Sequence, residues 1–277
     1  MRHTSGSFEA RDGLSLFRQT WLPDTPPHAA LINLHGLGDH SGLHARLVEW
    51  MVERGIGVYA YDARGNGRSG GQRAYVDRWS DYLDDLGRFV ALVRAETGDV
   101  PLFLAGTSLG GLVAIDYALT HGANGLAGVI AVAPPLGRLG VPPHLLLLAR
   151  ILSRVWPRFS LEAGMDLGGL ARDPAVADTV LNDPLFHRLG TARLSTEVES
   201  AIARVRSVDR VPVPLLLVHG GADRMVPPQG TRDFHAKLAA GDRTYIEYPG
   251  GYHALVADLG GDDVLRDMSR WIEARLS

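Results

Sequence analysis

The sequence predicts an α/β fold in which a mostly parallel sheet carries helices on both faces. Apolar runs of strand length alternate with amphipathic segments of helical length along most of the 277 residues. The runs are almost continuously apolar, a pattern typical of strands that are buried on both faces. The polar residues best suited to chemistry follow the ends of these runs, which is where parallel sheets place active sites.

The chain opens with a hairpin signal. Apolar segments at 8–10 and 14–21 flank Asp12-Gly13, a dipeptide that favours a tight antiparallel turn. Strands and helices then alternate, with strands expected at 29–36, 58–62, 102–106, 126–133, 214–220 and 244–248 and helices at 43–54, at 79–97 and directly after Ser108.

Residues 102–120 carry the most informative motif. A short apolar run, LFLAG, breaks at Thr107 and continues after Ser108 as an amphipathic segment, so the pattern predicts a strand, a sharp turn and a helix. Gly106 and Gly110 lack the Cβ atoms that would collide where the two elements meet. The G-x-S-x-G spacing therefore indicates a nucleophile elbow that presents Ser108.

Two further residues occupy positions that an activated serine needs. Asp223 follows the apolar run PLLLVHG, and His253 follows the strand TYIEY. The order Ser, Asp, His is the one associated with α/β-hydrolases. In such a triad His253 takes the Ser108 proton and later protonates the leaving group, while Asp223 fixes the tautomer of the imidazole.

The glycine-rich loop after the strand at 29–36 is expected to help form an oxyanion hole. Acyl transfer places negative charge on the carbonyl oxygen, and loss of one preorganised N–H donor costs about 10² to 10³ in rate. We assign the two donors to the backbone N–H groups of Leu37 and Leu109, the second of which follows the nucleophile.

The same loop permits a competing interpretation as a metal site. Its candidate ligands are His35, Asp39, His40 and His44. A leucine stands between His35 and Asp39, where a further histidine would strengthen that interpretation, and no second cluster of His and Asp is obvious. We therefore expect neither a metal ion nor another cofactor.

Six motifs together resemble the monoacylglycerol lipase branch of the α/β-hydrolases (serine aminopeptidase S33 type), which also contains lysophospholipases and carboxylesterases. They are, in chain order, HGLGDHSG, YDARGNGRSGG, GTSLGG, NDPL, GGADRMVPP and YHALV. The resemblance implies an eight-stranded, mostly parallel sheet with a small helical cap, and Ser108, Asp223 and His253 as the catalytic triad. It also implies hydrolysis, through an acyl-enzyme, of an ester with an apolar acyl chain, such as a monoacylglycerol, a lysophospholipid or a simple carboxylester.

The chain departs from that branch at three positions. The lipases carry an arginine after HSG, a histidine before the nucleophile and a tyrosine shortly before DPL, where this sequence has Leu43, Thr107 and Val180. In the family those polar groups help to hold the glycerol end of the substrate. We therefore expect these three residues to contact the substrate while offering a glycerol headgroup few directed hydrogen bonds.

The alternation of strands stops between 134 and 211, where prolines separate short helical pieces. We expect this segment to be a cap inserted into a core of residues 1–133 and 212–277. Its first helix, within 144–156, is apolar over a broad face, which is explained either by packing onto the core or by contact with an acyl chain or with a micelle or membrane surface. The positions expected to line an acyl channel are Leu145, Leu148, Ile151 and Leu152.

Composition excludes several classes of protein. The net charge of −3 argues against a nucleic-acid groove, and the absence of cysteine excludes disulfides, thiolate nucleophiles and cysteine–zinc sites. The first residues lack the apolar region of a secretory signal, and no apolar run approaches the roughly 20 residues that span a bilayer. We expect a cytoplasmic enzyme whose partner is a small lipid-like ester; the sequence carries no signal for its oligomeric state.

A glycine-rich loop at 62–71 invites a phosphate-binding interpretation that its sequence does not support. The segment DARGNGRSGG has neither the Lys-Ser/Thr ending of a P-loop nor a G-x-G-x-x-G turn between a strand and a helix. We interpret it as a structural loop in which Asp62 and Arg64 form an ion pair.

Two other functions are compatible with the same candidate residues. The triad also suits an aminopeptidase or amidase, in which acidic residues of the cap, Glu162, Asp166 and Asp173, would bind a substrate amine. A ligand-sensing protein with the α/β-hydrolase fold would keep the triad, turn over slowly and change the shape of its cap on binding. Analogy at the level of the fold does not separate these functions from ester hydrolysis.

Overall fold

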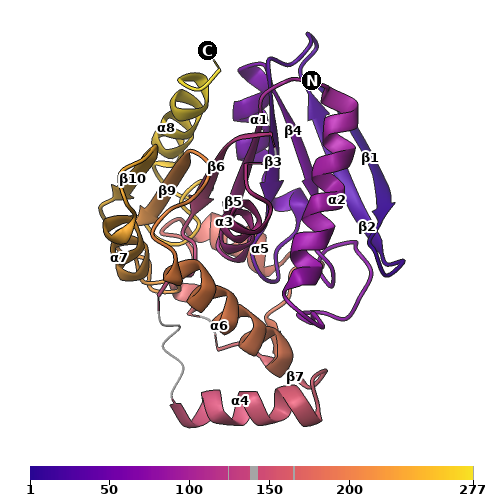
Figure 1. The fold of residues 1–277 in the computed structure, drawn as a ribbon, viewed down its shortest axis with the longest axis vertical. Coiled ribbons are helices and arrows are strands. Elements are labelled where there is room, and N and C mark those ends of the chain that lie inside the picture. The colour runs from indigo at the N-terminus through magenta and orange to yellow at the C-terminus, as the bar shows by residue number, and fades with distance from the viewer. Residues whose placement is uncertain (124, 138–142, 165, 277) are drawn as a thin grey trace.

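A computed structural model describes residues 1–123, 125–137, 143–164 and 166–276. Within these residues eight strands form one sheet in the order β1-β2-β4-β3-β5-β6-β9-β10, and β7 pairs with β8 (Figure 1). The strands are β1 (Arg2–Glu9), β2 (Ser15–Leu22), β3 (Ala29–Leu34), β4 (Ile56–Tyr61), β5 (Leu102–Thr107), β6 (Leu126–Val132), β7 (Ser160–Glu162), β8 (Leu189–Thr191), β9 (Leu215–Gly220) and β10 (Arg243–Tyr248). The α-helices are α1 (Ala45–Glu53), α2 (Ser80–Thr97), α3 (Leu109–His121), α4 (Pro143–Val155), α5 (Pro174–Leu181), α6 (Ala192–Ser207), α7 (Gln229–Lys237) and α8 (Gly261–Glu273).

The pairing of the strands confirms the predicted fold class. β1 and β2 form the expected hairpin, in which Arg2 lies opposite Leu22 and Glu9 lies opposite Ser15. β2 also runs antiparallel to β4, whereas the other neighbours in the sheet pair in parallel. The result is the expected eight-stranded, mostly parallel sheet with helices around it.

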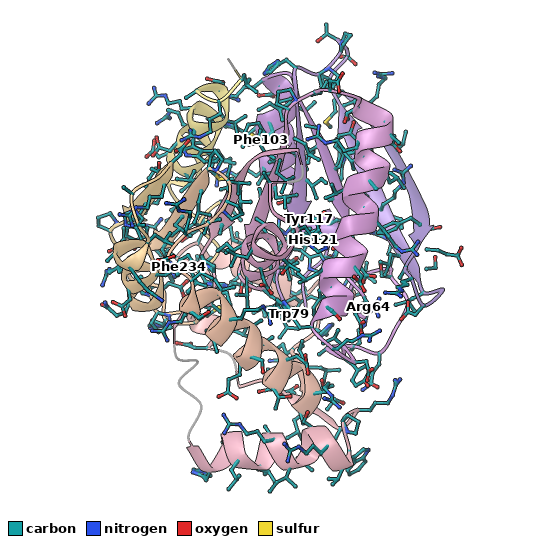
Figure 2. The ribbon with its side chains drawn as sticks, in the orientation of Figure 1. Arg64, Trp79, Phe103, Tyr117, His121 and Phe234 are labelled. Carbon is teal, nitrogen blue, oxygen red and sulfur yellow. The ribbon has the colours of Figure 1, made fainter. Side chains whose placement is uncertain are left out.

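The sheet separates two apolar cores. Side chains alternate along a strand, so Ala29 and Leu31 of β3 face α1 and α8, while Ala30 and Ile32 face α2 and α3. The same division places Phe103 of β5 in one core and Tyr117 of α3 in the other; both side chains are labelled in Figure 2. Because both faces are covered, these strands are apolar throughout instead of alternating with polar residues.

The parallel strands bring four loops to one edge of the sheet. β3, β5, β9 and β10 run in the same direction, so the segments that follow their carboxyl ends lie at the same edge. Those segments begin after Leu34, Thr107, Gly220 and Tyr248 and contain the sequence-predicted site residues Leu37, Ser108, Asp223 and His253.

The predicted cap interval contains α4, β7, α5, β8 and α6. Because β6 and β9 are neighbours in the sheet, all of these elements are inserted between adjacent strands; residues 138–142 and 165 of the interval lie outside the described residues. α4 lies against α6 and away from the sheet, at the bottom of Figure 1, where Ser153 Oγ is 2.9 Å from Thr196 Oγ1. α6 is tied to the core because the fully buried Asp116 of α3 accepts a hydrogen bond from Arg204 Nε at 2.9 Å.

The loop at 62–71 is held by ion pairs that the sequence analysis did not anticipate. Arg64 donates to the buried Asp85 of α2 at 2.7 and 2.8 Å and to Asp12 at 3.0 Å. Asp62 instead accepts hydrogen bonds from Ser41 N at 2.8 Å and from Arg68 N at 2.8 Å. The predicted pair of Asp62 and Arg64 is therefore wrong, because their side chains reach different elements.

No helix among the described residues is long and apolar enough to cross a membrane.

Candidate active site

Ser108 stands at the turn between β5 and α3 in a conformation that few L-residues adopt. Its φ is 53° and its ψ is −120°, outside the main allowed regions. A Cβ atom at Gly106 would lie 2.3 Å from the backbone of Gly110, and one at Gly110 would lie 2.4 Å from Leu34 O. Backbone atoms at such distances cannot move aside cheaply, so this turn requires both glycines. The local geometry is that of a nucleophile elbow.

Asp223 and His253 come together from two different loops. His253 Nδ1 donates to Asp223 Oδ2 at 2.7 Å, and both side chains are buried. The other carboxylate oxygen, Oδ1, accepts hydrogen bonds from the backbone N–H groups of Met225 and Val226 at 2.9 Å each. With its proton on Nδ1, a neutral His253 keeps Nε2 free to accept a proton.

Asp223 is ionised despite its burial. Burial raises the pKa of this carboxyl group, but hydrogen bonds from His219 and His253 outweigh the effect and lower the pKa to about 2. His219 is fully buried at the end of β9, and its Nε2 donates to Val226 O at 2.8 Å while lying 3.4 Å from Asp223 Oδ2. The carboxylate therefore has an imidazole on two sides, a feature that the sequence analysis missed although His219 is four residues before Asp223.

The segment Gly36-Leu37 approaches Ser108 closely. A Cβ atom at Gly36 would lie 3.3 Å from Ser108 Cβ, which shows how near the two backbones are. His35 Nδ1 donates to Gly36 O at 2.7 Å, and because N–H and C=O of a trans peptide point in opposite directions, this bond directs the Leu37 N–H away from His35. Leu109 is the first residue of α3, so its N–H has no acceptor within the helix.

The histidines of the loop at 35–44 are engaged in separate hydrogen bonds instead of converging on one point. His35 Nε2 accepts from Ala63 N at 2.8 Å, and His40 Nδ1 accepts from Gly42 N at 3.1 Å. His44 Nε2 donates to Asp39 Oδ2 at 2.9 Å. Among the described residues no group of three or more His, Asp or Glu side chains is placed to hold a metal ion.

Asp39 and His44 form an ion pair on the wall of the site. Burial raises the pKa of Asp39, but the imidazole of His44 lowers it to about 2. Burial lowers the pKa of His44, and the Asp39 carboxylate overcomes this and raises it above its usual value. The pair places localised charge beside a cavity whose walls are otherwise mostly apolar.

A cavity of about 150 Å³ joins Ser108 and His253. The predicted contact residues Leu43, Thr107 and Val180 line it, as does Leu37. Further apolar walls come from α1, the cap interval and the loops after β9 and β10, namely Leu47, Leu167, Leu170, Phe186, Met225, Leu255 and Val256. The sequence analysis missed these residues, although Met225 and Leu255 stand two positions after Asp223 and His253.

The structure does not bring the predicted channel residues of α4 to this cavity. Leu145, Leu148, Ile151 and Leu152 are absent from its lining, and the first three are exposed, with 51% of Ile151 accessible to solvent. The reason is the position of α4, which packs on α6 and turns much of its apolar surface outward.

The acidic residues of the predicted cap interval also lie outside the cavity lining. Asp166 is 3.1 Å from Arg224, and Glu162 is 3.5 Å from Arg188. Asp173 caps α5 by accepting a hydrogen bond from Ala175 N at 2.9 Å. Each carboxylate thus has a partner other than a substrate amine.

The chain as a whole is similar to several known proteins. The model of the family described as serine aminopeptidase, S33, matches residues 25–260. A monoacylglycerol lipase of Mycolicibacterium smegmatis is 29% identical over 98% of this chain and 97% of its own length, and a monoglyceride lipase of Rattus norvegicus is 30% identical over 96% and 89%. The crystal structure of Paleococcus ferrophilus monoacylglycerol lipase is similar with a TM-score of 0.83 at 30% identity, over 99% of this chain and 100% of that one.

Proposed function

Since the chain belongs to the serine aminopeptidase S33 family, in the branch that resembles monoacylglycerol lipases, and is a carboxylic ester hydrolase, we propose that Ser108, Asp223 and His253 are its catalytic triad. The observation that carries the proposal is the 2.7 Å hydrogen bond between His253 and the ionised Asp223, beside a cavity that also contains the strained Ser108. A residue other than glycine at a positive φ is strained, and such strain clusters at active sites.

The reaction proceeds in two steps. His253 Nε2 accepts the Ser108 proton as Oγ attacks the ester carbonyl, and the imidazolium then gives that proton to the departing alcohol, which leaves an acyl-enzyme. In the second step water attacks the acyl-enzyme, His253 again carries the proton, and the carboxylic acid is released. Asp223 stabilises the imidazolium in both steps, and the N–H groups of Leu37 and Leu109 donate to the oxyanion.

We propose that the substrate is an ester with an apolar acyl chain, such as a monoacylglycerol, a lysophospholipid or a simple alkyl ester. The apolar lining of the cavity and the names of the relatives support this class. A dry apolar cavity of 150 Å³ is large enough to hold benzene, so this one accepts about six carbon atoms before longer chains must extend beyond it. With Leu43, Thr107 and Val180 near the site, the glycerol end gains few directed hydrogen bonds.

The first prediction concerns acyl length. For p-nitrophenyl esters below their micellar concentrations, we expect kcat/KM to rise by up to about fourfold (0.8 kcal/mol) for each methylene that enters the cavity, and then to level off. Val180→Phe adds a ring to the lining and is expected to move the plateau to shorter chains. Val155→Phe, on the exposed surface of α4, is the matched control and is expected to leave the profile unchanged.

The same assay with other leaving groups separates the candidate substrates. We expect a monoacylglycerol and the methyl ester of the same acyl chain to differ by no more than about tenfold in kcat/KM, and aminoacyl amides to react far more slowly. A preference of a hundredfold for the glycerol ester would mean that other groups, such as the pair of Asp39 and His44, bind the headgroup. Faster turnover of aminoacyl amides would instead establish the aminopeptidase function.

We also propose that residues 134–211 act as a cap whose helix α4 touches micelle or membrane surfaces transiently. Exposed apolar side chains gather on α4 at Leu145, Leu147, Leu148, Ile151 and Val155, and Trp156 follows its end. Arg150 and Arg154 flank them, an arrangement that suits an interfacial helix.

A vesicle assay tests this contact. The double variant Leu148→Asp/Ile151→Asp is expected to weaken sedimentation with phosphatidylcholine–phosphatidylglycerol vesicles by at least about tenfold, while hydrolysis of monomeric p-nitrophenyl butyrate is unchanged. Leu259→Asp, at an exposed leucine of the core, is the control. Equal vesicle binding by all three proteins would show that α4 does not dock on lipid.

A further inference from the structure

Gly38, next to the assigned oxyanion donor Leu37, is held from both sides of its backbone. Its N–H donates to Asn66 Oδ1 at 3.1 Å, and its C=O accepts from the backbone N–H of His187 at 3.0 Å. Asn66 belongs to the loop after β4, whereas His187 belongs to the cap interval between α5 and β8. Three segments that are far apart in the sequence therefore meet at one residue of the oxyanion loop.

The side chain of His187 bonds to the same Asn66 oxygen as Gly38 does. Its Nε2 donates to the same Asn66 Oδ1 at 3.0 Å, because a carbonyl oxygen can only accept. Its Nδ1 then accepts from Leu189 N at 3.3 Å, which fixes a neutral imidazole with the proton on Nε2. Burial, reinforced by the positive charge of Arg73, lowers the pKa of His187 to about 4, so the imidazole stays neutral at pH 7.

Gly38 packs closely against His187, and Asn66, which bonds to both residues, is held in the core. Gly38 has a φ of +77°, and a Cβ atom there would lie 2.0 Å from His187 O, so no other residue fits against the cap. Asn66 is almost completely buried, and its Nδ2 donates to Arg64 O at 3.1 Å. Arg64 in turn is fixed by Asp85 of α2, so the Asn66 oxygen is anchored in the core.

We propose that Asn66 and His187 are positioning residues that fix the backbone of Gly38, Asn66 through its N–H and His187 through its C=O, and thereby hold the preceding residue, Leu37, with its N–H aimed at the oxyanion. The proposal rests on the proposed function, because it assumes that Leu37 is an oxyanion donor. Its consequence is that the segment of the cap around His187 must be seated on the oxyanion loop before the hole is complete. The cap then contributes to catalysis through the loop, in addition to covering the substrate.

The chemistry predicts a specific kinetic signature. An oxyanion exists only in the transition state and the tetrahedral intermediate, so a misaimed donor lowers kcat and leaves KM almost unchanged. Loss of a whole donor lowers kcat by a factor of about 10² to 10³. For Asn66→Ala, which removes the acceptor of the Gly38 N–H, we expect kcat to fall by about 10²-fold. His187→Ala keeps the hydrogen bond from its backbone N–H to Gly38 O but loses the side-chain bond to Asn66, so kcat should fall by about tenfold. His187→Gln retains a side-chain donor and should recover most of the activity.

The test combines kinetics with two ligands. An alkyl trifluoromethyl ketone forms a reversible serine adduct whose oxygen occupies the oxyanion hole, whereas an ether of the same length cannot be attacked. For Asn66→Ala and His187→Ala, we expect the inhibition constant of the ketone to rise in proportion to the loss of kcat, with the affinity for the ether unchanged. Asn182→Ala is the matched control and should behave as wild type, because within the described part of the chain this exposed side chain bonds only to Asp178 O.

Three results would overturn the inference: wild-type kcat in both alanine variants, equal weakening of ketone and ether, or no difference between His187→Gln and His187→Ala. If Asn66→Ala does not fold, the two His187 variants decide the question alone. Failure of the proposed function is recognised separately, because then the ketone would not inhibit the wild-type enzyme through Ser108.

Discussion

Replacing Ser108 by alanine is expected to lower kcat/KM for esters by at least about 10⁴-fold while the protein remains folded. The loss is large because no acyl-enzyme can form without the hydroxyl group. The fold should persist because the Ser108 side chain makes no capping hydrogen bond to α3, and alanine adopts the same backbone angles at the same cost. Initial rates and thermal melting of the purified variant measure both effects.

The matched control is Ser200→Ala. Ser200 is exposed, and its hydroxyl donates to Thr196 O within α6, so this variant should retain wild-type rates. Wild-type activity in a folded Ser108→Ala protein would exclude Ser108 as the nucleophile. Loss of wild-type activity on treatment with a chelator would instead point to a metal-dependent reaction.

Asp223→Asn is expected to cost about 10³- to 10⁴-fold in kcat with little change in KM. Asparagine is neutral, and its amide group can donate to Nδ1 of His253, which would move the imidazole proton to Nε2 and block proton transfer from Ser108. Asp166→Asn, at an exposed carboxylate paired with Arg224, is the control and should keep full activity. Activity near the wild-type level in Asp223→Asn would exclude Asp223 as the partner of the base.

The same variant also tests whether the Asp223 carboxylate is ionised, through the pH dependence of the stability of the fold. The pKa of Asp223 falls from near 3.9 in the unfolded chain to about 2 in the folded protein, so the ionised carboxylate stabilises the fold above about pH 4. This contribution is lost as the pH falls from about 4 through 2. The difference in melting temperature between wild type and Asp223→Asn should therefore become smaller as the pH is lowered from about 4 to about 2.

The core of the fold was predictable because each strand carries its own signal. Strands buried on both faces must be apolar throughout, so β5 was expected at 102–106 and is observed at Leu102–Thr107. Helix α1 begins at Ala45 instead of 43 because Ser41–Leu43 form a 3-10 turn, capped by His40 Nδ1, which accepts from Gly42 N. Such a local side-chain cap is invisible to hydrophobic periodicity.

The candidate site was predictable only where a motif carries it. Ser108, Asp223 and His253 each follow a strand in an ordered sheet, and the parallel topology gathers them at one edge. The cavity lining was not predictable, because Leu170 and Phe186 reach it from parts of the predicted cap interval, 134–211, that have no regular pattern. For α4, amphipathic spacing indicated a broad apolar face but not which surface that face meets.

The measurement that tests the central claim most directly is labelling with an alkyl fluorophosphonate followed by peptide mass analysis. Because the account makes Ser108 a nucleophile that forms a covalent acyl-enzyme, it predicts one adduct per chain, located on the peptide that contains Ser108, formed more slowly while an excess of ester substrate is present and absent from Ser108→Ala. An adduct on a different residue, or labelling of Ser108→Ala at the wild-type rate, would contradict it.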